Sequence, residues 1–181
     1  YDFKKDDFVF KLNKLNKAPS KLDQKKLINI NSNYLKKANT KYLLEEIRRK
    51  FEIKNKNTLK NLLNFLPDLL KRYNFLNEVE NDLKWIDENS FHINDQAIIK
   101  KLNDNNEIIN NIYDLLKSCD WEANTIKTII DKYVNDNNKK MSEVAPLIRL
   151  ALTGKTNSPD IYNIIYILGK DTCLNRLKNS G

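Results

Sequence analysis

Glycine is scarce in this chain: there are only three among 181 residues, and one of them is the last residue. The other two, Gly154 and Gly169, each follow an apolar run in the stretch VAPLIRLALTGKTNSPDIYNIIYILGKD. Because glycine enters the left-handed backbone conformation without steric cost, such a position predicts the end of a helix. Ser158 is expected to cap the second helix, with Pro159 in its first turn. Residues 155–160 then form a short, rigidly held loop, which is a good place for recognition.

Apolar residues recur at helical spacing along most of the remaining chain. One long helix is expected over Asp95–Ser118, and Asp120 is expected to cap the next. Pro67 interrupts a third apolar run and predicts either a kink or a new helix start. The first 20 residues instead indicate a short strand or loop element. The sequence therefore predicts an all-α fold, an antiparallel helical bundle or cage, after a short irregular or strand-like element.

The positive charge of the chain is unevenly distributed. The net charge is +8 overall, and the sequence divides into +10 for residues 1–60, −5 for 61–120 and +3 for 121–181. Lysine and arginine supply most of the sequence-independent affinity of proteins for nucleic acid, so the basic first third favours a polyphosphate partner. A solvated lysine surface with no partner is the alternative interpretation.

Several classes of chemistry find no support in the sequence. Three glycines cannot build a glycine-rich nucleotide loop, and a single histidine excludes the common catalytic and zinc constellations. No stretch approaches about 18 uninterrupted apolar residues, the length that crosses a membrane. With two cysteines and no secretory segment, we expect a cytoplasmic protein with reduced thiols, no metal and no membrane contact.

The segment RLALTGKTNSPDIYNIIYILGKDTCLNRL resembles the C-terminal end of bacterial glutamyl-tRNA synthetases. The family pattern is roughly P-L-R-x-A-L-T-G, a short loop with a small or hydroxyl residue and a proline, then an apolar helix ending L-G-K and a final R-L. The matching positions are Arg149, Ala151, Leu152, Thr153, Gly154, Pro159, Leu168, Gly169, Lys170, Arg176 and Leu177. Upstream, KAPSKLDQKKLININSNYLKKA is similar to the segment that follows the catalytic half of the family. The resemblance spans about residues 10–178.

The resemblance implies the tRNA-binding half of such an enzyme. It implies an anticodon-stem region over residues 1–45 and two anticodon-binding helical subdomains over 46–118 and 119–181. The residues that would read the second and third anticodon bases are Arg149, Thr156, Ser158, Pro159 and Ile161, although Pro159 could merely start a helix and Ile161 merely fill the core. The candidates for contacts with stem phosphates are Lys25, Lys26, Lys36, Lys37, Arg48 and Arg49.

The same resemblance implies the partner and the chemistry of the parent enzyme. A complete synthetase would attach glutamate to glutamate tRNA with ATP and Mg²⁺, and both ATP signatures would lie before Tyr1. We therefore expect no cofactor, no metal and no catalytic residue in this chain, and we expect it to bind tRNA as a monomer.

One departure from the family pattern concerns the first anticodon base. Family members that are strict for glutamate tRNA carry Pro-Arg where this chain has Pro67-Asp68. An aspartate cannot donate the two hydrogen bonds that an arginine directs to a base edge. Our hypothesis is that the parent enzyme is relaxed at this base and also accepts glutamine tRNA, unless Lys71 or Arg72 takes the role.

Two other kinds of protein could be built from such a sequence. An all-helical interaction or scaffold module would explain the amphipathic helices equally well, but not the L-T-G and L-G-K motifs or the basic first third. An autonomous enzyme has the least support, since no acid, base or nucleophile constellation is present.

Overall fold

The computed structural model describes residues 23–51, 53, 55–87, 91–156 and 158–180. This part of the chain contains helices and no strand, which confirms the all-α prediction. The strand-like element expected in the first 20 residues lies outside the described residues. In chain order the helices are α1 (Gln24–Lys37), α2 (Thr40–Lys50), α3 (Lys56–Leu70), α4 (Leu76–Asp82), the 3₁₀ helix η3 (Leu83–Ile86), α5 (Gln96–Asn103), α6 (Asn106–Ser118), α7 (Ala123–Asp136), α8 (Met141–Thr153), α9 (Ile161–Leu168) and α10 (Lys170–Lys178).

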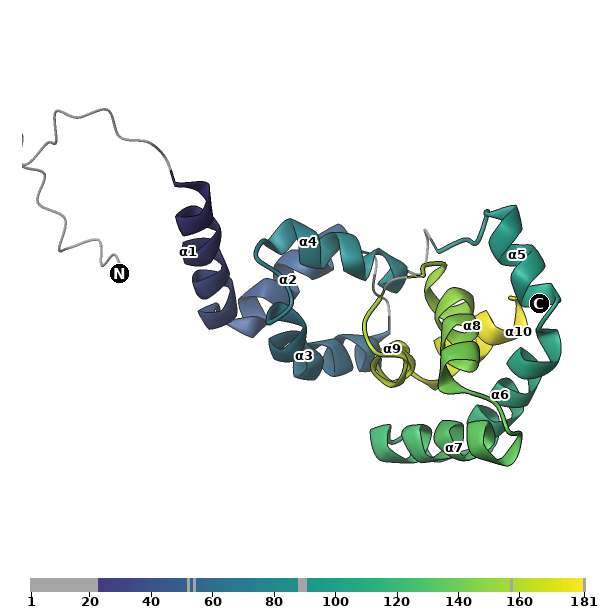
Figure 1. Ribbon diagram of the computed structural model, residues 1–181. Helices are drawn as coiled ribbons and strands as arrows, with labels where there is room; N and C mark the ends of the chain where they lie inside the picture. Colours follow the sequence, from purple (N-terminus) through teal and green to yellow (C-terminus); the bar gives the residue numbers. More distant parts are fainter. Residues whose placement is uncertain (1–22, 52, 54, 88–90, 157, 181) are drawn as a thin grey trace, which may run out of the picture.

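The helices form an elongated assembly in which α1 lies at one end and α5 and α6 at the other (Figure 1). Helix α9 packs against α3, and α10 packs against α6, so the two halves of the chain share one continuous core. Two side chains of α3 also bond to the end of α9: Thr58 Oγ1 donates to the Leu168 carbonyl at 3.1 Å, and Asn61 Nδ2 donates to the Tyr166 carbonyl at 2.7 Å. These bonds join residues more than a hundred positions apart in the sequence.

Helix α1 is the least buried of the long helices. Its apolar residues follow the expected helical spacing, but only Ser32 and Leu35 are buried. Leu27, Ile30 and Tyr34 are 46%, 43% and 46% exposed. Its N-cap is Asp23, whose side chain accepts a hydrogen bond from the Lys26 amide at 3.2 Å. The start of helix α1 is therefore stabilised by its N-cap, but tertiary packing contributes little to holding the helix in place.

The prediction of one long helix over Asp95–Ser118 is wrong, because the structure has two helices, α5 and α6, in this segment. Helix α5 ends at Asn103 and α6 begins at Asn106. Asn105 departs from helical geometry at φ −121° and ψ 24°, and its side-chain amide donates to the Lys101 carbonyl at 2.8 Å. Short polar side chains compete for backbone partners in this way, and the run Asn-Asp-Asn-Asn concentrates them at the break.

Two smaller expectations are also corrected. Asp120 does not cap α7, whose N-cap is Glu122; the Asp120 carbonyl instead accepts from the Glu122 amide at 2.9 Å. Pro67 does not begin a helix, because α3 continues through it to Leu70. Leu66 and Leu69 on either side of Pro67 are fully buried, and their packing supports the helix across the missing backbone donor.

Candidate nucleic-acid interface

The loop between α8 and α9, residues 154–160, is held at both ends. Gly154 adopts the left-handed conformation at φ 66° and donates to the Leu150 carbonyl at 2.8 Å, as its sequence position predicted. Thr153 Oγ1 donates to the Arg149 carbonyl at 2.8 Å and accepts from the Lys155 amide at 3.2 Å. These bonds close the last turn of α8 and fix the direction in which the loop leaves it.

The start of α9 differs from the sequence prediction. Asp160 is the N-cap, and its side chain accepts from the Tyr162 amide at 3.0 Å. Ser158 Oγ instead donates to the Pro159 carbonyl at 3.2 Å, and Pro159 lies buried before the helix begins. An aspartate is as good a cap as a serine, and here the helix begins at Ile161, whose side chain is buried.

Four of the five residues expected to read anticodon bases therefore divide into two pairs. Thr156 is exposed and Ser158 is half-buried, so both present polar side chains on the loop. Pro159 is buried and Ile161 is 3% exposed, which leaves their side chains in the core. The fifth residue is Arg149, one turn of α8 before the loop.

Arg149 carries a hydrogen-bond donor with no partner in the described part of the protein. Its side chain is half-buried, and its Nε is shielded from solvent without an acceptor. A buried unpaired donor costs about 1–3 kcal/mol, so such a group in a folded protein calls for an explanation. Trp85 Nε1 and Trp121 Nε1 are shielded and unpaired among the described residues in the same way, so the shielded Nε of Arg149 is not by itself evidence of a ligand.

The end of α3 carries the residues expected near the first anticodon base. Asp68 is exposed and forms an ion pair with Lys71, one turn further along the helix. Arg72 is exposed as well. The Tyr73 hydroxyl donates to the Asp82 carboxylate, which connects the end of α3 to the end of α4. The Asp68 carboxylate is thus partly neutralised by its own neighbour rather than directed freely at a ligand.

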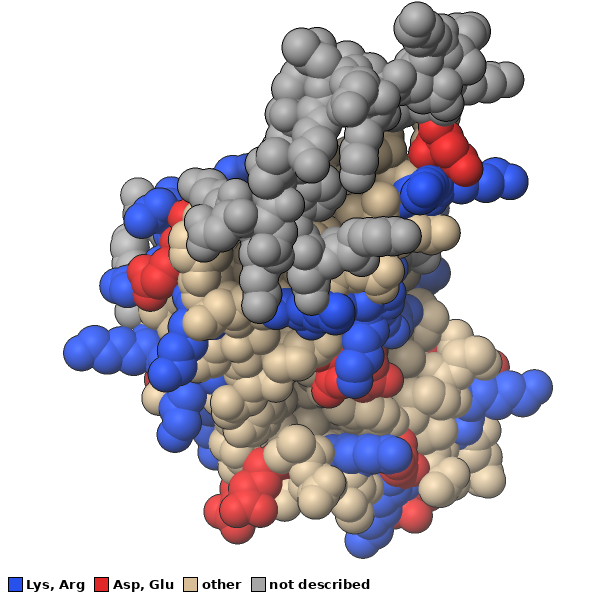
Figure 2. Space-filling model, turned by 90° about the vertical axis from the view of Figure 1, so that its left-hand side faces the viewer, with Lys and Arg blue, Asp and Glu red and all other residues tan. Residues whose placement is uncertain are grey.

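The six candidates for phosphate contacts all lie at the α1 end of the molecule. Lys25, Lys26, Lys36 and Lys37 are exposed on α1. Arg48 and Arg49 are exposed on α2, and each is paired with a glutamate three residues earlier, at 3.7 and 2.7 Å. Figure 2 shows this end of the molecule, where blue basic side chains predominate over red acidic ones. Exposed ion pairs of this kind contribute little to stability.

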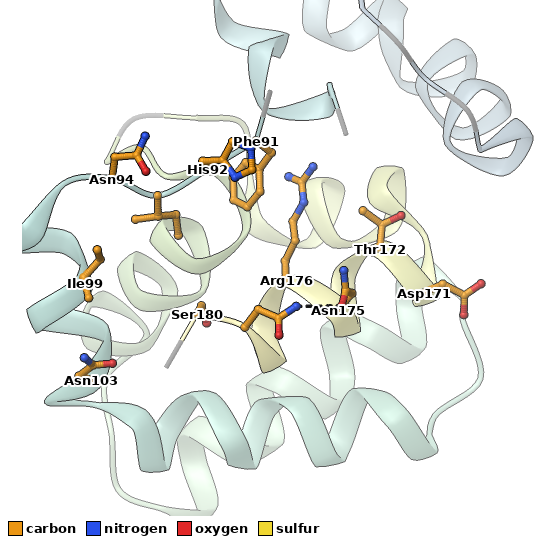
Figure 3. A pocket seen from close by; sticks show the side chains of 12 residues that line it. Phe91, His92, Asn94, Ile99, Asn103, Asp171, Thr172, Asn175, Arg176 and Ser180 are labelled. Atoms are coloured by element: carbon orange, nitrogen blue, oxygen red, sulfur yellow. Dashed lines mark hydrogen bonds between the residues drawn. The ribbon is translucent and has the colours of Figure 1, made fainter. Parts of the chain in front are cut away.

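A cavity of about 890 Å³ lies on another side of the structure, between the segment that starts at Phe91 and helices α5 and α10 (Figure 3). Most of the groups around it are uncharged, and its buried cation, Arg176, is already engaged. Arg176 donates to the carbonyls of Trp85 and Leu152, both at 2.7 Å, and its guanidinium lies 3.7 Å from the centre of the Phe91 ring. The motif residue Arg176 is therefore a structural arginine.

The residues that the structure describes contain no group of three or more His, Cys, Asp or Glu side chains suited to a metal. None of the described helices is both long enough and apolar enough to cross a bilayer.

Sequence reasoning missed Lys155. It lies in the loop, and a lysine there would be expected to face a phosphate. The structure turns it inward, where its Nζ donates to the Asn81 carbonyl at 2.7 Å. The sequence around Lys155 gives no indication of this contact, because the partner is 74 positions away.

The helical cage, the closed loop after α8 and the half-buried Arg149 beside it define an all-helical domain with a candidate recognition loop. The family model described as "Anticodon binding domain" matches residues 40–180, and the chain belongs to this family.

Among curated relatives, the chain is 30% identical over 182 residues to "Glutamate--tRNA ligase 2" of Bartonella quintana and 29% identical over 180 residues to "Glutamate--tRNA ligase 1" of Bartonella bacilliformis. These matches cover 94% and 93% of this chain and 38% of each relative, so the chain spans well under half the length of the relatives it matches. A solved glutamate tRNA ligase from Elizabethkingia meningosepticum superposes with a TM-score of 0.74 at 23% identity, covering 94% of this chain and 34% of that one, and confirms the fold.

Proposed function

We propose that this chain is the tRNA-recognising part of a glutamate–tRNA ligase, with tRNA as its partner. The observation that carries the proposal is the position of Arg149, half-buried and one turn before a loop that presents Thr156 and Ser158. Anticodon bases are unstacked and can be bound along their edges, and an arginine fork is well suited to this. The family match and the curated relatives support the same assignment over the scaffold alternative.

The attachment of glutamate would belong to the remainder of the parent enzyme. We derive no catalytic step from the described residues, and the absence of ATP and Mg²⁺ from this part of the enzyme stays a prediction. The division into residues 1–45, 46–118 and 119–181, the monomeric state and the cytoplasmic location stay predictions.

The first test is binding of the chain to a glutamate tRNA transcript and to variants changed singly at the three anticodon positions. Changes at the second and third positions should weaken binding by at least tenfold, about 1.4 kcal/mol, and the first position should be tolerant. Equal binding of every transcript would leave a basic helical surface without base recognition and would overturn the proposal.

Arg149→Lys tests the residue that carries the proposal. Lysine keeps the charge but loses the planar fork, so affinity for the correct transcript should fall about tenfold or more while the salt dependence stays the same. Lys100→Arg, which exchanges the same two side chains at an exposed position of α5, is the control and should change affinity less than twofold. Equal effects of the two substitutions would remove Arg149 from the interface.

Specificity at the first base is tested at Asp68. We propose that the wild-type chain binds glutamate and glutamine tRNAs with affinities within tenfold of each other, because Asp68 cannot donate to a base. Asp68→Arg should create a preference for glutamate tRNA, and Asp68→Asn should not. A wild-type preference of tenfold or more for glutamate tRNA would contradict the hypothesis. Lys71 and Arg72 would then be the candidates for reading the first base.

A further inference from the structure

Lys155 is a lysine on the candidate recognition loop that faces the protein. Its Nζ donates to the Asn81 carbonyl at 2.7 Å and lies 3.5 Å from the Asp82 carbonyl. These are the last two residues of α4. The final carbonyls of a helix lack intrahelical donors and carry the negative end of its dipole, so an ammonium group is a good partner for them.

The environment of Lys155 differs from that of a lysine held ready for phosphate. Burial lowers its pKa, the nearby Asp82 carboxylate raises it, and Lys84 lowers it further. An ammonium held by backbone carbonyls is poorly placed to reach RNA, and moving it out would break its bond to the Asn81 carbonyl. Lys155 therefore fastens the loop to α4.

The same end of α4 is also fastened to α3. The Tyr73 hydroxyl donates to the Asp82 carboxylate, and burial followed by this bond raises the pKa of Tyr73 well above its ordinary value. Tyr73 lies three residues after the end of α3, directly after Lys71 and Arg72 and five residues after Asp68. Residues 81–82 are thus bonded both to the end of α3 and to the α8–α9 loop.

We propose that Lys155 and Tyr73, through their shared attachment to Asn81 and Asp82, set the spacing between the end of α3 and the α8–α9 loop. Lys155 is a positioning residue: it holds in register the two elements that read different anticodon bases, and it does not touch the RNA. This inference rests on the proposed function, since it assigns to Lys155 a part in base discrimination at that same interface.

The first arm of the test uses no RNA. Hydrogen exchange of peptides covering residues 154–160 is compared among wild type, Lys155→Met, Lys155→Arg and the control Lys100→Met, which removes an exposed lysine of α5. Lys155→Met should speed exchange in the loop at least tenfold. Lys155→Arg, which can still donate to the carbonyls, should restore most of the protection, and Lys100→Met should match wild type. Unchanged exchange in Lys155→Met would overturn the attachment whatever the function of the chain.

The second arm measures affinities for the correct transcript and for transcripts changed at the second or third anticodon position, at several salt concentrations. Lys155→Met should reduce the preference for the correct base at least fivefold, while the slope of log K against log salt stays at the wild-type value. A lysine that contacts phosphate behaves in the opposite way: its removal weakens all transcripts alike and lowers the slope by about 0.7–0.9. That result would overturn the positioning role.

Coupling to α3 is tested with Tyr73→Phe, which removes the hydroxyl and keeps the ring. If both residues act through Asn81 and Asp82, the double variant should lose less discrimination than the product of the single losses. Independent effects that multiply would contradict the shared attachment. If the wild-type chain does not discriminate among transcripts at all, the proposed function fails, and the hydrogen-exchange arm still decides whether Lys155 fastens the loop.

Discussion

Arg176 and Arg149 both belong to the C-terminal segment that matches the family pattern, yet their surroundings differ. Arg176 is 6% exposed, and its guanidinium bonds to the carbonyls of Trp85 and Leu152. Arg149 has a shielded Nε that no described residue accepts from. The motif identified both positions as important, but the distinction between a structural arginine and a ligand-binding one depends on carbonyls that come from distant parts of the chain.

Replacing Arg176 should destabilise the fold. Arg176→Met keeps much of the side-chain volume but leaves two buried carbonyls without a donor, so we expect a loss of about 2–4 kcal/mol in the free energy of unfolding. Urea denaturation of the variant measures this loss. Lys178→Met, an exposed position on the same helix, is the control and should stay within about 0.5 kcal/mol of wild type. A small effect of Arg176→Met would show that the carbonyls find other donors.

Ionisation of Tyr162 is expected to make the free energy of unfolding depend on pH in the alkaline range. Burial, and then the bond from its hydroxyl to the Asp131 carboxylate, raise the pKa of Tyr162 above its ordinary value of 10.0. The contribution is fully present below pH 10, where the unfolded tyrosine is neutral, and is lost as the pH rises and the unfolded tyrosine ionises first. The loss for one proton is at most about 1.4 kcal/mol per pH unit, and solvent exposure reduces it.

The measurement is urea denaturation of wild type and Tyr162→Phe at pH 9 and pH 11. Wild-type stability should fall more over this interval than that of the variant, because the variant lacks the titrating hydroxyl. Parallel curves would show that the hydroxyl keeps an ordinary pKa.

Helix ends were the most reliable prediction wherever glycine was involved. Gly154 and Gly169 both have positive φ, at 66° and 77°. Their ψ values differ: Gly154 is left-handed helical at 11°, whereas Gly169 is extended at 167°, a region that is essentially restricted to glycine. Gly169 also ends α9 and precedes α10 with no other residue between them.

Substitutions at the two glycines should therefore have unequal costs. A Cβ atom at either position would meet nothing closer than 3.8 Å, so the backbone conformation sets the penalty. Gly154→Asn should cost less than about 1 kcal/mol, because asparagine tolerates the left-handed region, and Gly169→Asn should cost about 1–3 kcal/mol. Thermal unfolding of both variants checks the order, and equal losses would contradict it.

Helix starts and breaks were predicted less well, and the reason is local competition. Ser158 and Asp160 are both good caps two residues apart, and the choice of Asp160 accompanies the burial of Pro159 before the helix. The apolar residues return at helical spacing at Ile108 and Ile109, beyond Asp104 and Asn105, so the spacing predicted one helix across the break between α5 and α6. Apolar spacing predicts that helices exist, and competing polar side chains decide where they begin and end.

Over the entire chain, the fold class followed from the sequence, whereas the bonds that organise the interface did not. Amphipathic spacing is a local property and was sufficient to predict an all-α structure. The bonds of Thr58 to Leu168, Lys155 to Asn81 and Arg176 to Trp85 join residues 110, 74 and 91 positions apart. A single sequence carries no periodic signal for such pairs, so the orientation of the candidate site had to come from the structure.

The separation between the basic α1 end and the α8–α9 loop predicts that affinity and selectivity can be changed independently. Changing Lys25, Lys26, Lys36 and Lys37 together to glutamine should lower the slope of log K against log salt by about 0.7–0.9 for each phosphate that is no longer neutralised. Preference among anticodon variants should stay unchanged, because the loop is untouched. Titrations at 50 and 200 mM salt measure both quantities. A drop in selectivity without a change in slope would show that these lysines do not bind phosphate.

The position of Arg176 has a consequence for biosynthesis. A ribosome makes Trp85 91 residues before it makes Arg176, and Leu152 24 residues before it. The Trp85 and Leu152 carbonyls therefore lack the donor that Arg176 supplies while the intervening helices emerge. The nascent chain can form its helices in order of translation, but η3 and the end of α8 acquire their shared partner only when α10 has left the exit tunnel. The packing of η3, α8 and α10 is thus expected to be completed as one late event in the folding of this part of the chain.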